Sequence, residues 1–267
     1  MEGHSRDRHY RAGVVTIAVP YHLDERLPAF STGLPVGHEV TADLPDGSTW
    51  DRLAVLYEQV ARVVQTAGST PVVVSGDCTT SLGVLAGLQR AGRRPGVVWF
   101  DAHADFHTED TTTSGYLGGL PLALAVGTGT LTLPAALGLV PVPEQRAVLV
   151  DARDTDPGED ELLAGSDVVR TRVEDLDADG LPDGDLYLHV DIDVADPAEV
   201  PDLLYPAPGG PSVAAVLAAV ARVAATGRVV AVGIAATWRH GGESATAHDE
   251  LLRRLVAAAQ PPASGVR

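Results

Sequence analysis

The sequence has 267 residues, of which 45% are hydrophobic and 21% charged, so it holds enough apolar material for a large buried core. Its 19 basic and 36 acidic residues give a net charge of −17, which repels nucleic-acid phosphates and anionic membranes and excludes both as expected partners. The single cysteine excludes an internal disulfide, no apolar run reaches the ~18 residues of a membrane-spanning helix, and residues 1–13 are too polar for a secretory signal. We therefore expect a cytoplasmic protein.

Short apolar runs rich in valine alternate with segments rich in alanine and leucine along the chain. The apolar runs are typical of strands that are covered on both faces, and we predict them at 14–19, 71–75, 96–100, 147–150, 186–190 and 229–232. We predict helices at 50–66, 81–90, 211–225 and 248–259, whereas 124–139 fits either a helix or a loop. This alternation predicts one α/β domain over residues 1–267, with three α/β/α layers and a mostly parallel central sheet.

Polar residues follow three of the predicted strands. In open parallel sheets, ligands bind beyond the carboxyl ends of the strands, so these residues form the candidate site. Asp101, His103 and Asp105 follow the strand 96–100 at every second position, and the pair Asp191 and Asp193 follows 186–190 in the same way. If the strand geometry continues, side-chain alternation places each set on one side. Cys78 lies three residues beyond the strand 71–75.

Four carboxylates that converge without a cation would repel one another, and two divalent ions would remove that repulsion. A ligand set of oxygens with one imidazole suits Mn(II), whereas a cysteine ligand favours zinc or iron. Either acidic motif alone would fit a solvated loop, and Cys78 alone would fit a small buried side chain. Two motifs that each follow a buried strand favour a metal centre. His189 shares the face of Asp191, and we expect it to pack below the site. Six further histidines are expected at the surface, namely His4, His9, His22, His38, His240 and His248.

Five segments resemble signatures of the arginase (ureohydrolase) family. WFDAHAD at 99–105 and HVDIDVADP at 189–197 resemble its two metal-binding motifs, and SGDCTTSLG at 75–83 resembles its third, which usually reads GGDHS. TTTSGYL at 111–117 and RDTDPGE at 153–159 resemble two substrate loops of arginases. The segments occur in the order that the family has, so the resemblance covers most of the chain and implies an arginase-like fold.

The resemblance implies a hydrolase of guanidino C–N bonds with a dinuclear metal-hydroxide mechanism, two divalent ions that we expect to be Mn(II), and a homo-oligomer, either a trimer or a hexamer. One ion would be held by Cys78, Asp101, Asp105 and Asp191, and the other by Asp101, His103, Asp191 and Asp193. Asp101 and Asp191 would bridge the ions, and Asp105 would orient the attacking hydroxide. The α-carboxylate and α-amino groups of an amino-acid substrate would be bound by His107, Thr112, Ser114, Asp156 and Glu159.

Three departures from the family pattern concern the guanidino end of the pocket. Cys78 replaces a ligand histidine, Gly118 replaces a proton-shuttle histidine, and Ala236 replaces a glutamate that pairs with the guanidinium. A buried guanidinium without a carboxylate costs several kcal/mol, so plain arginine fits poorly, whereas a less basic N-hydroxyguanidine can bind uncharged.

The cysteine itself resembles that of the Nω-hydroxy-L-arginine amidinohydrolases, and we expect that activity. One alternative is an ordinary arginase in which Glu243 or His240 replaces the missing groups. Another is an inactive, metal-binding pseudoenzyme. A purely structural acidic domain is disfavoured, because clustered carboxylates without metal would destabilise it.

Overall fold

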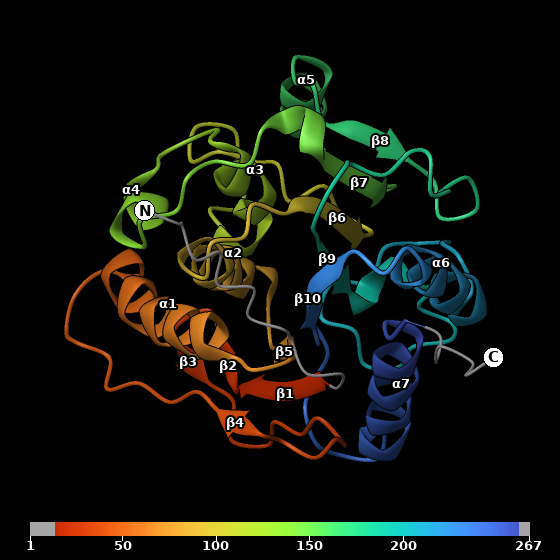
Figure 1. Ribbon diagram of the computed structural model, residues 1–267, viewed down its shortest axis with the longest axis horizontal. Helices are drawn as coiled ribbons and strands as arrows, with labels where there is room; N and C mark the ends of the chain where they lie inside the picture. The colour runs from red at the N-terminus through yellow and green to blue at the C-terminus, as the bar shows by residue number, and fades with distance from the viewer. Residues whose placement is uncertain (1–13, 262–267) are drawn as a thin grey trace, which may run out of the picture.

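The central sheet carries the fold and is parallel throughout. The computed structural model describes residues 14–261. The coil that we expected up to residue 12 therefore lies outside the described residues, as does the coil expected from residue 260 except for residues 260 and 261. The eight strands run in the order β4-β1-β5-β10-β9-β6-β7-β8 (Figure 1), and every neighbouring pair is parallel. Their bounds are β1 Val14–Val19, β4 His38–Glu39, β5 Thr70–Ser75, β6 Gly96–Asp101, β7 Ala147–Asp151, β8 Val169–Thr171, β9 Leu186–Asp191 and β10 Val229–Ala235.

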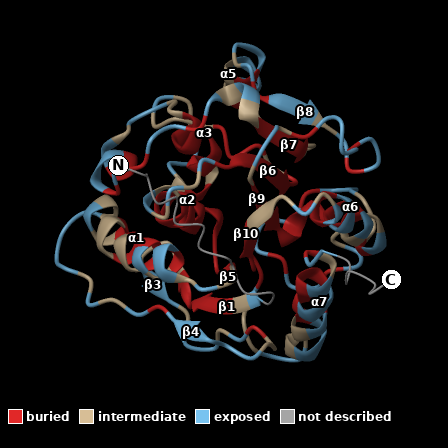
Figure 2. Ribbon diagram, viewed as in Figure 1, coloured by how far each residue is buried: buried red, intermediate tan, exposed pale blue. Residues whose placement is uncertain are grey.

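Helices cover both faces of the sheet and bury two separate apolar layers (Figure 2). On β5, Val73 packs into the layer beneath α1–α4, whereas Val72 and Val74 face α6 and α7, as strand alternation requires. The helices are α1 Thr49–Thr66, α2 Ser81–Arg90, α3 Pro121–Val126, α4 Thr132–Ala136, α5 Pro157–Ala164, α6 Val213–Ala225 and α7 Ala245–Ala258. The predicted three-layer α/β/α fold is therefore confirmed.

All six predicted strands and all four predicted helices are present, with ends that shift by up to three residues. The segment 124–139 contains the end of α3, a loop and α4. The sequence did not reveal the two-stranded antiparallel ribbon of β2 Tyr21–His22 and β3 Glu25–Arg26, the edge strands β4 and β8, or the short helix α5. These elements are short and largely exposed, so they lack the long apolar runs that marked the others.

Over residues 14–261, no helix combines the length and the apolar character that crossing a membrane requires.

Candidate metal centre

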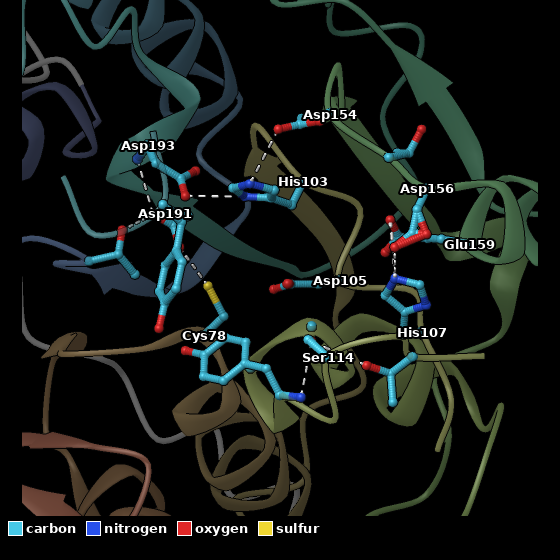
Figure 3. Close-up of a pocket in the computed structure, with 17 residues that line it drawn as sticks. Cys78, His103, Asp105, His107, Ser114, Asp154, Asp156, Glu159, Asp191 and Asp193 are labelled. Atoms are coloured by element: carbon cyan, nitrogen blue, oxygen red, sulfur yellow. Dashed lines mark hydrogen bonds and ion pairs between the residues drawn. The ribbon is translucent and has the colours of Figure 1, made fainter. Parts of the chain in front are cut away.

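Four neighbouring strands, β5, β10, β9 and β6, bring the candidate residues to one edge of the sheet. Cys78 follows β5, Thr237 follows β10, Asp191 ends β9 and Asp101 ends β6. Because parallel strands all end at the same edge, these side chains meet although they are far apart in the sequence. Cys78, Asp191 and Thr237 border a cavity of roughly 250 Å³, into which His103 and Asp105 also point (Figure 3).

We expected side-chain alternation on the condition that strand geometry continues past Asp101 and Asp191. That condition is not met, because both strands end at these residues. Each strand end instead turns through the same local hydrogen bond, in which an aspartate accepts from the backbone N–H two residues on. The distances are 2.8 Å from Thr79 to Asp77, 2.8 Å from His103 to Asp101 and 3.0 Å from Asp193 to Asp191. Aspartate favours such turns, and here they aim the following side chains back into the cavity.

His103 lies between two buried carboxylates. Its Nδ1 is 3.2 Å from Asp193 Oδ2 and 3.5 Å from Asp101 Oδ1. Burial alone would lower the pKa of His103, but the hydrogen bonds to the two aspartates outweigh it and raise the pKa to about 12. Without a metal, a protonated imidazole therefore supplies the positive charge in this cluster. A metal would need the neutral imidazole, so binding at His103 must release a proton.

Cys78 occupies the other side of the centre. Its Sγ donates to Asp191 Oδ2 at 2.9 Å and lies 3.9 Å from Asp101 Oδ2. His189 packs below the site as expected, stacked on Trp99 with 3.7 Å between ring centroids, and its Nε2 also lies 3.3 Å from Cys78 Sγ. Burial raises the pKa of the Cys78 thiol, and the charge of Asp191 raises it further, so a cation is needed to make it a thiolate.

Asp105 carries a buried polar atom that lacks a partner. Its Oδ2 has no hydrogen bond among the described residues, and Figure 3 shows its carboxylate in the middle of the cavity. The residue has a φ of 51°, a left-handed conformation that aspartate tolerates better than most residues. Burial raises its pKa well above the usual range, and the charges of Asp101 and Asp191 add to this. A divalent cation would satisfy this oxygen and relieve the repulsion.

The predicted ligands thus share one site, although not all in one close cluster. There are two sets of three residues, and within each set the donor atoms lie within 4.8 Å of one another. One set is Asp101, His103 and Asp193, and the other is Asp101, Cys78 and His189. Asp105 and Asp191 belong to neither set, but both line the same cavity. The structure places the donors where two neighbouring cations could be held, and the assignment of each ligand stays a prediction.

The predicted substrate residues line the same cavity, and His107, Asp156 and Glu159 lie beyond Asp105, across from Cys78 (Figure 3). His107 Nε2 lies 3.4 Å from Asp156 Oδ2 and 4.0 Å from Glu159 Oε2. Glu159 Oε1 accepts from the backbone N–H of Phe106 at 2.8 Å. Thr112 and Ser114 lie in the loop beside them, with 3.5 Å between their hydroxyl oxygens. Alternating acceptors and donors of this kind suit the charged ends of an amino acid.

The structure also places the three departures from the family pattern. Gly118 lines the cavity, whereas Ala236 is fully buried in the apolar layer under α6 and α7. The residue that enters the cavity from this strand end is Thr237, which donates to Asp191 Oδ1. Neither Glu243 nor His240 is among the described residues that line the cavity. The interpretation in which one of them replaces the missing groups therefore loses its geometric support.

Sequence reasoning missed Tyr116 and Tyr205, which line the cavity, and His22, whose Nε2 lies 3.1 Å and 3.4 Å from their hydroxyl oxygens. His22 ends the two-residue strand β2 and the tyrosines lie in two distant loops, so no local pattern links the three residues. Of the six histidines expected at the surface, His4 and His9 lie outside the described residues, and only His38 of the other four is exposed. The expectation is wrong for His22, which is half-buried, and for His248, which stacks on Trp238 with 4.1 Å between ring centroids.

Comparison with known proteins places these features in a family. The model of the arginase family matches residues 11–238. An arginase from Brevibacillus brevis is 33% identical over 60% of this chain and 59% of its own length. An N(omega)-hydroxy-L-arginine amidinohydrolase from Streptomyces lavendulae is 38% identical over 49% of this chain and 47% of its own length. The aligned part of the chain thus spans about half to two thirds of the length of these curated relatives.

The fold comparison agrees with the sequence comparison. An arginase structure from Bacillus subtilis aligns with a TM-score of 0.79 at 21% identity, covering 92% of this chain and 97% of that chain. An arginase structure from Entamoeba histolytica, in complex with L-ornithine, aligns with a TM-score of 0.78 at 20% identity and the same coverage. At these identities the structures show a common fold. Together with the family match over most of the chain, they establish that this protein belongs to the arginase family.

Proposed function

We propose that the protein hydrolyses a guanidino C–N bond in an arginine derivative hydroxylated at its guanidino end, to give ornithine and a urea derivative. The observation that carries this proposal is the contrast between the two sides of the cavity. The side with His107, Asp156 and Glu159 keeps the groups for an amino acid, whereas the end of β10 contributes Thr237 rather than a carboxylate. An uncharged N-hydroxyguanidine needs no buried counter-ion at that end.

The proposal includes two divalent cations, expected to be Mn(II). The partnerless oxygen of Asp105 and the buried aspartates around it fit such a group. Cys78, Asp101, Asp105 and Asp191 would hold one ion, and Asp101, His103, Asp191 and Asp193 the other. When bound, the pair would supply a water of lowered pKa close to the guanidino carbon. Asp105, which lies in the middle of the cavity, would accept a hydrogen bond from that water and fix its direction of attack.

A substrate panel tests the proposal. The metal-loaded protein should hydrolyse Nω-hydroxy-L-arginine at least about tenfold more efficiently than L-arginine, because the second substrate must bury its charge unpaired. Agmatine, which lacks the α-carboxylate, should be a poor substrate of either kind. Preference for L-arginine would support ordinary arginase activity, which the several arginases among the relatives favour. No hydrolysis with manganese, zinc or iron would support a metal-binding pseudoenzyme.

Replacement of Cys78 tests its role as a ligand. Cys78→Ser should weaken one ion more than the other, because a hydroxyl is a poorer ligand than a thiolate. Cys78→His should move the metal preference towards manganese, because imidazole is less soft than sulfur. Metal content after dialysis against mixed manganese and zinc measures both effects. A metal content and rate that are unchanged in Cys78→Ser and in Cys78→Ala would mean that the thiol only fills space.

The predicted oligomer and the cytoplasmic location stay predictions.

A further inference from the structure

The ring of Tyr116 occupies the space beside Gly118 in which any other residue would place its side chain. A Cβ atom added at Gly118 would overlap two ring carbons and the hydroxyl oxygen of Tyr116. The φ of Gly118 is not in the left-handed region, so the backbone itself would accept another residue. The departure at position 118 and the tyrosine at position 116 are therefore one structural feature.

His22 fixes the Tyr116 hydroxyl. His22 Nδ1 lies 3.0 Å from the carbonyl oxygen of Gly76 and can only donate to it, which leaves Nε2 as an acceptor. The Tyr116 hydroxyl, at 3.1 Å from Nε2, then donates to it, and the Tyr205 hydroxyl lies 3.4 Å from the same nitrogen. The rings support this arrangement, since His22 stacks on Tyr116 with 5.8 Å between centroids and an angle of 14°. We call His22, Tyr116 and Tyr205 the tyrosine wall.

The tyrosine wall lies on the Cys78 side of the cavity. Gly76, which holds His22, is two residues before Cys78, and the short turn Leu117–Gly119 packs against the turn Cys78–Thr80. Tyr116 and Tyr205 both line the cavity. His107, Asp156 and Glu159 lie across the cavity from Cys78 (Figure 3). A substrate that places its amino-acid end against those three residues would therefore extend its guanidino end towards the wall.

We propose that Tyr116, positioned by His22 and flanked by Tyr205, determines specificity by accepting a hydrogen bond from the N-hydroxyl group of the substrate. A phenol that donates a hydrogen bond to His22 still has lone pairs on its oxygen, and these lone pairs can only accept hydrogen bonds. An N-hydroxyguanidine carries an O–H donor one atom beyond its guanidino nitrogen, whereas plain arginine has only N–H donors and none at that position. The inference rests on the proposed function and adds Tyr116 as the residue that recognises the N-hydroxyl group of the substrate.

Tyr116→Phe is the direct test. It should lower kcat/KM for Nω-hydroxy-L-arginine about five- to tenfold, the value of one neutral hydrogen bond, with L-arginine changed less than about twofold. The loss should appear mainly in KM, because the bond already forms in the ground state. Tyr21→Phe is the matched control, since its hydroxyl lies 3.3 Å from the backbone nitrogen of Ala42 outside the cavity. An equal loss for both substrates in Tyr116→Phe would overturn the inference.

A pair of variants at Gly118 provides a second test. Gly118→Ala should cause a similar selective loss, because its Cβ displaces the Tyr116 ring. In a Tyr116→Ala background the same change should cost nothing further, since the space is then free. Additive losses would overturn the inference.

Binding separates the inference from the proposed function. If the wild type hydrolyses neither substrate, the proposed function fails, but calorimetry of the manganese-loaded protein with each compound still tests the wall. The wild type should bind Nω-hydroxy-L-arginine more tightly than L-arginine, and Tyr116→Phe should reduce that ratio about five- to tenfold. A ratio that Tyr116→Phe leaves unchanged would reject the wall even in an active enzyme.

Discussion

Replacing Asp191 with asparagine should abolish binding of both metal ions and lower the rate of hydrolysis at least about a hundredfold, because removal of a group that merely supports a ligand already costs about 10- to 100-fold in metal affinity. Asp191 Oδ2 faces Cys78 Sγ at 2.9 Å, and Oδ1 accepts from the N–H of Asp193 and from Thr237. An asparagine oxygen can keep the contacts of Oδ1, so the turn should survive while the charge is lost.

The same variant should make the metal-free protein more stable. Burial raises the pKa of Asp191 well above its usual range, and the charges of Asp193 and Asp101 raise it further, so the ionised group destabilises the folded state. Thermal unfolding in a chelator and metal analysis of the same preparation measure both effects. Asp185→Asn is the matched control, because it removes the same charge directly before the same strand, where Asp185 pairs with Arg93. Two tightly bound ions per chain in Asp191→Asn would contradict the bridging role.

The sequence predicted the candidate centre well because its residues follow the most buried strands. The runs that end at Asp101 and Asp191 are fully buried, so their strands were recognisable, and parallel topology then brought their ends together. The local path was not predictable from alternation, since hydrogen bonds within the turns after Asp101 and Asp191 override strand geometry. The alternation of side chains along β9 did predict correctly that His189, two residues before Asp191, lies on the same face of the strand.

The tyrosine wall could not be predicted in the same way. His22, Tyr116 and Tyr205 lie in loops or in a two-residue strand, where neither hydrophobic periodicity nor the strand order fixes the path of the chain. The departure at Gly118 was visible in the sequence, but its cause was not. In the sequence alone, glycine at position 118 indicates only a lost histidine, whereas the structure shows that the Tyr116 ring occupies the space of its side chain.

Metal binding should stabilise the protein more as the pH rises. Above about pH 7.5, where histidines of the unfolded chain have lost their protons, every group of the metal centre that holds a proton in the folded state has a raised pKa. His103 has a pKa of about 12, and the pKa values of Asp105 and Asp191 are well above the usual range because both are buried. The opposing groups, Asp101 with a lowered pKa and His189 with a pKa of about 3, have already lost their protons in both states.

The sign then follows from proton counting. Over this range the folded, metal-free protein holds more protons than the unfolded chain, so its free energy of unfolding falls as the pH rises, by about 1.4 kcal/mol per pH unit for each extra proton. Bound cations displace those protons and replace their charge, which removes the slope. The melting temperature in a chelator should therefore fall from about pH 7.5 to about pH 9, while that of the manganese-loaded protein stays nearly level.

Differential scanning calorimetry across this range, with and without manganese, measures the difference directly. Asp185→Asn should keep the widening gap, because its charge lies outside the centre, at the opposite end of β9. His103→Asn should narrow the gap, because it removes the group that holds its proton most strongly over this range. A stabilisation by manganese that is the same at every pH would mean that the ions bind without displacing the proton of His103, and so bind somewhere else.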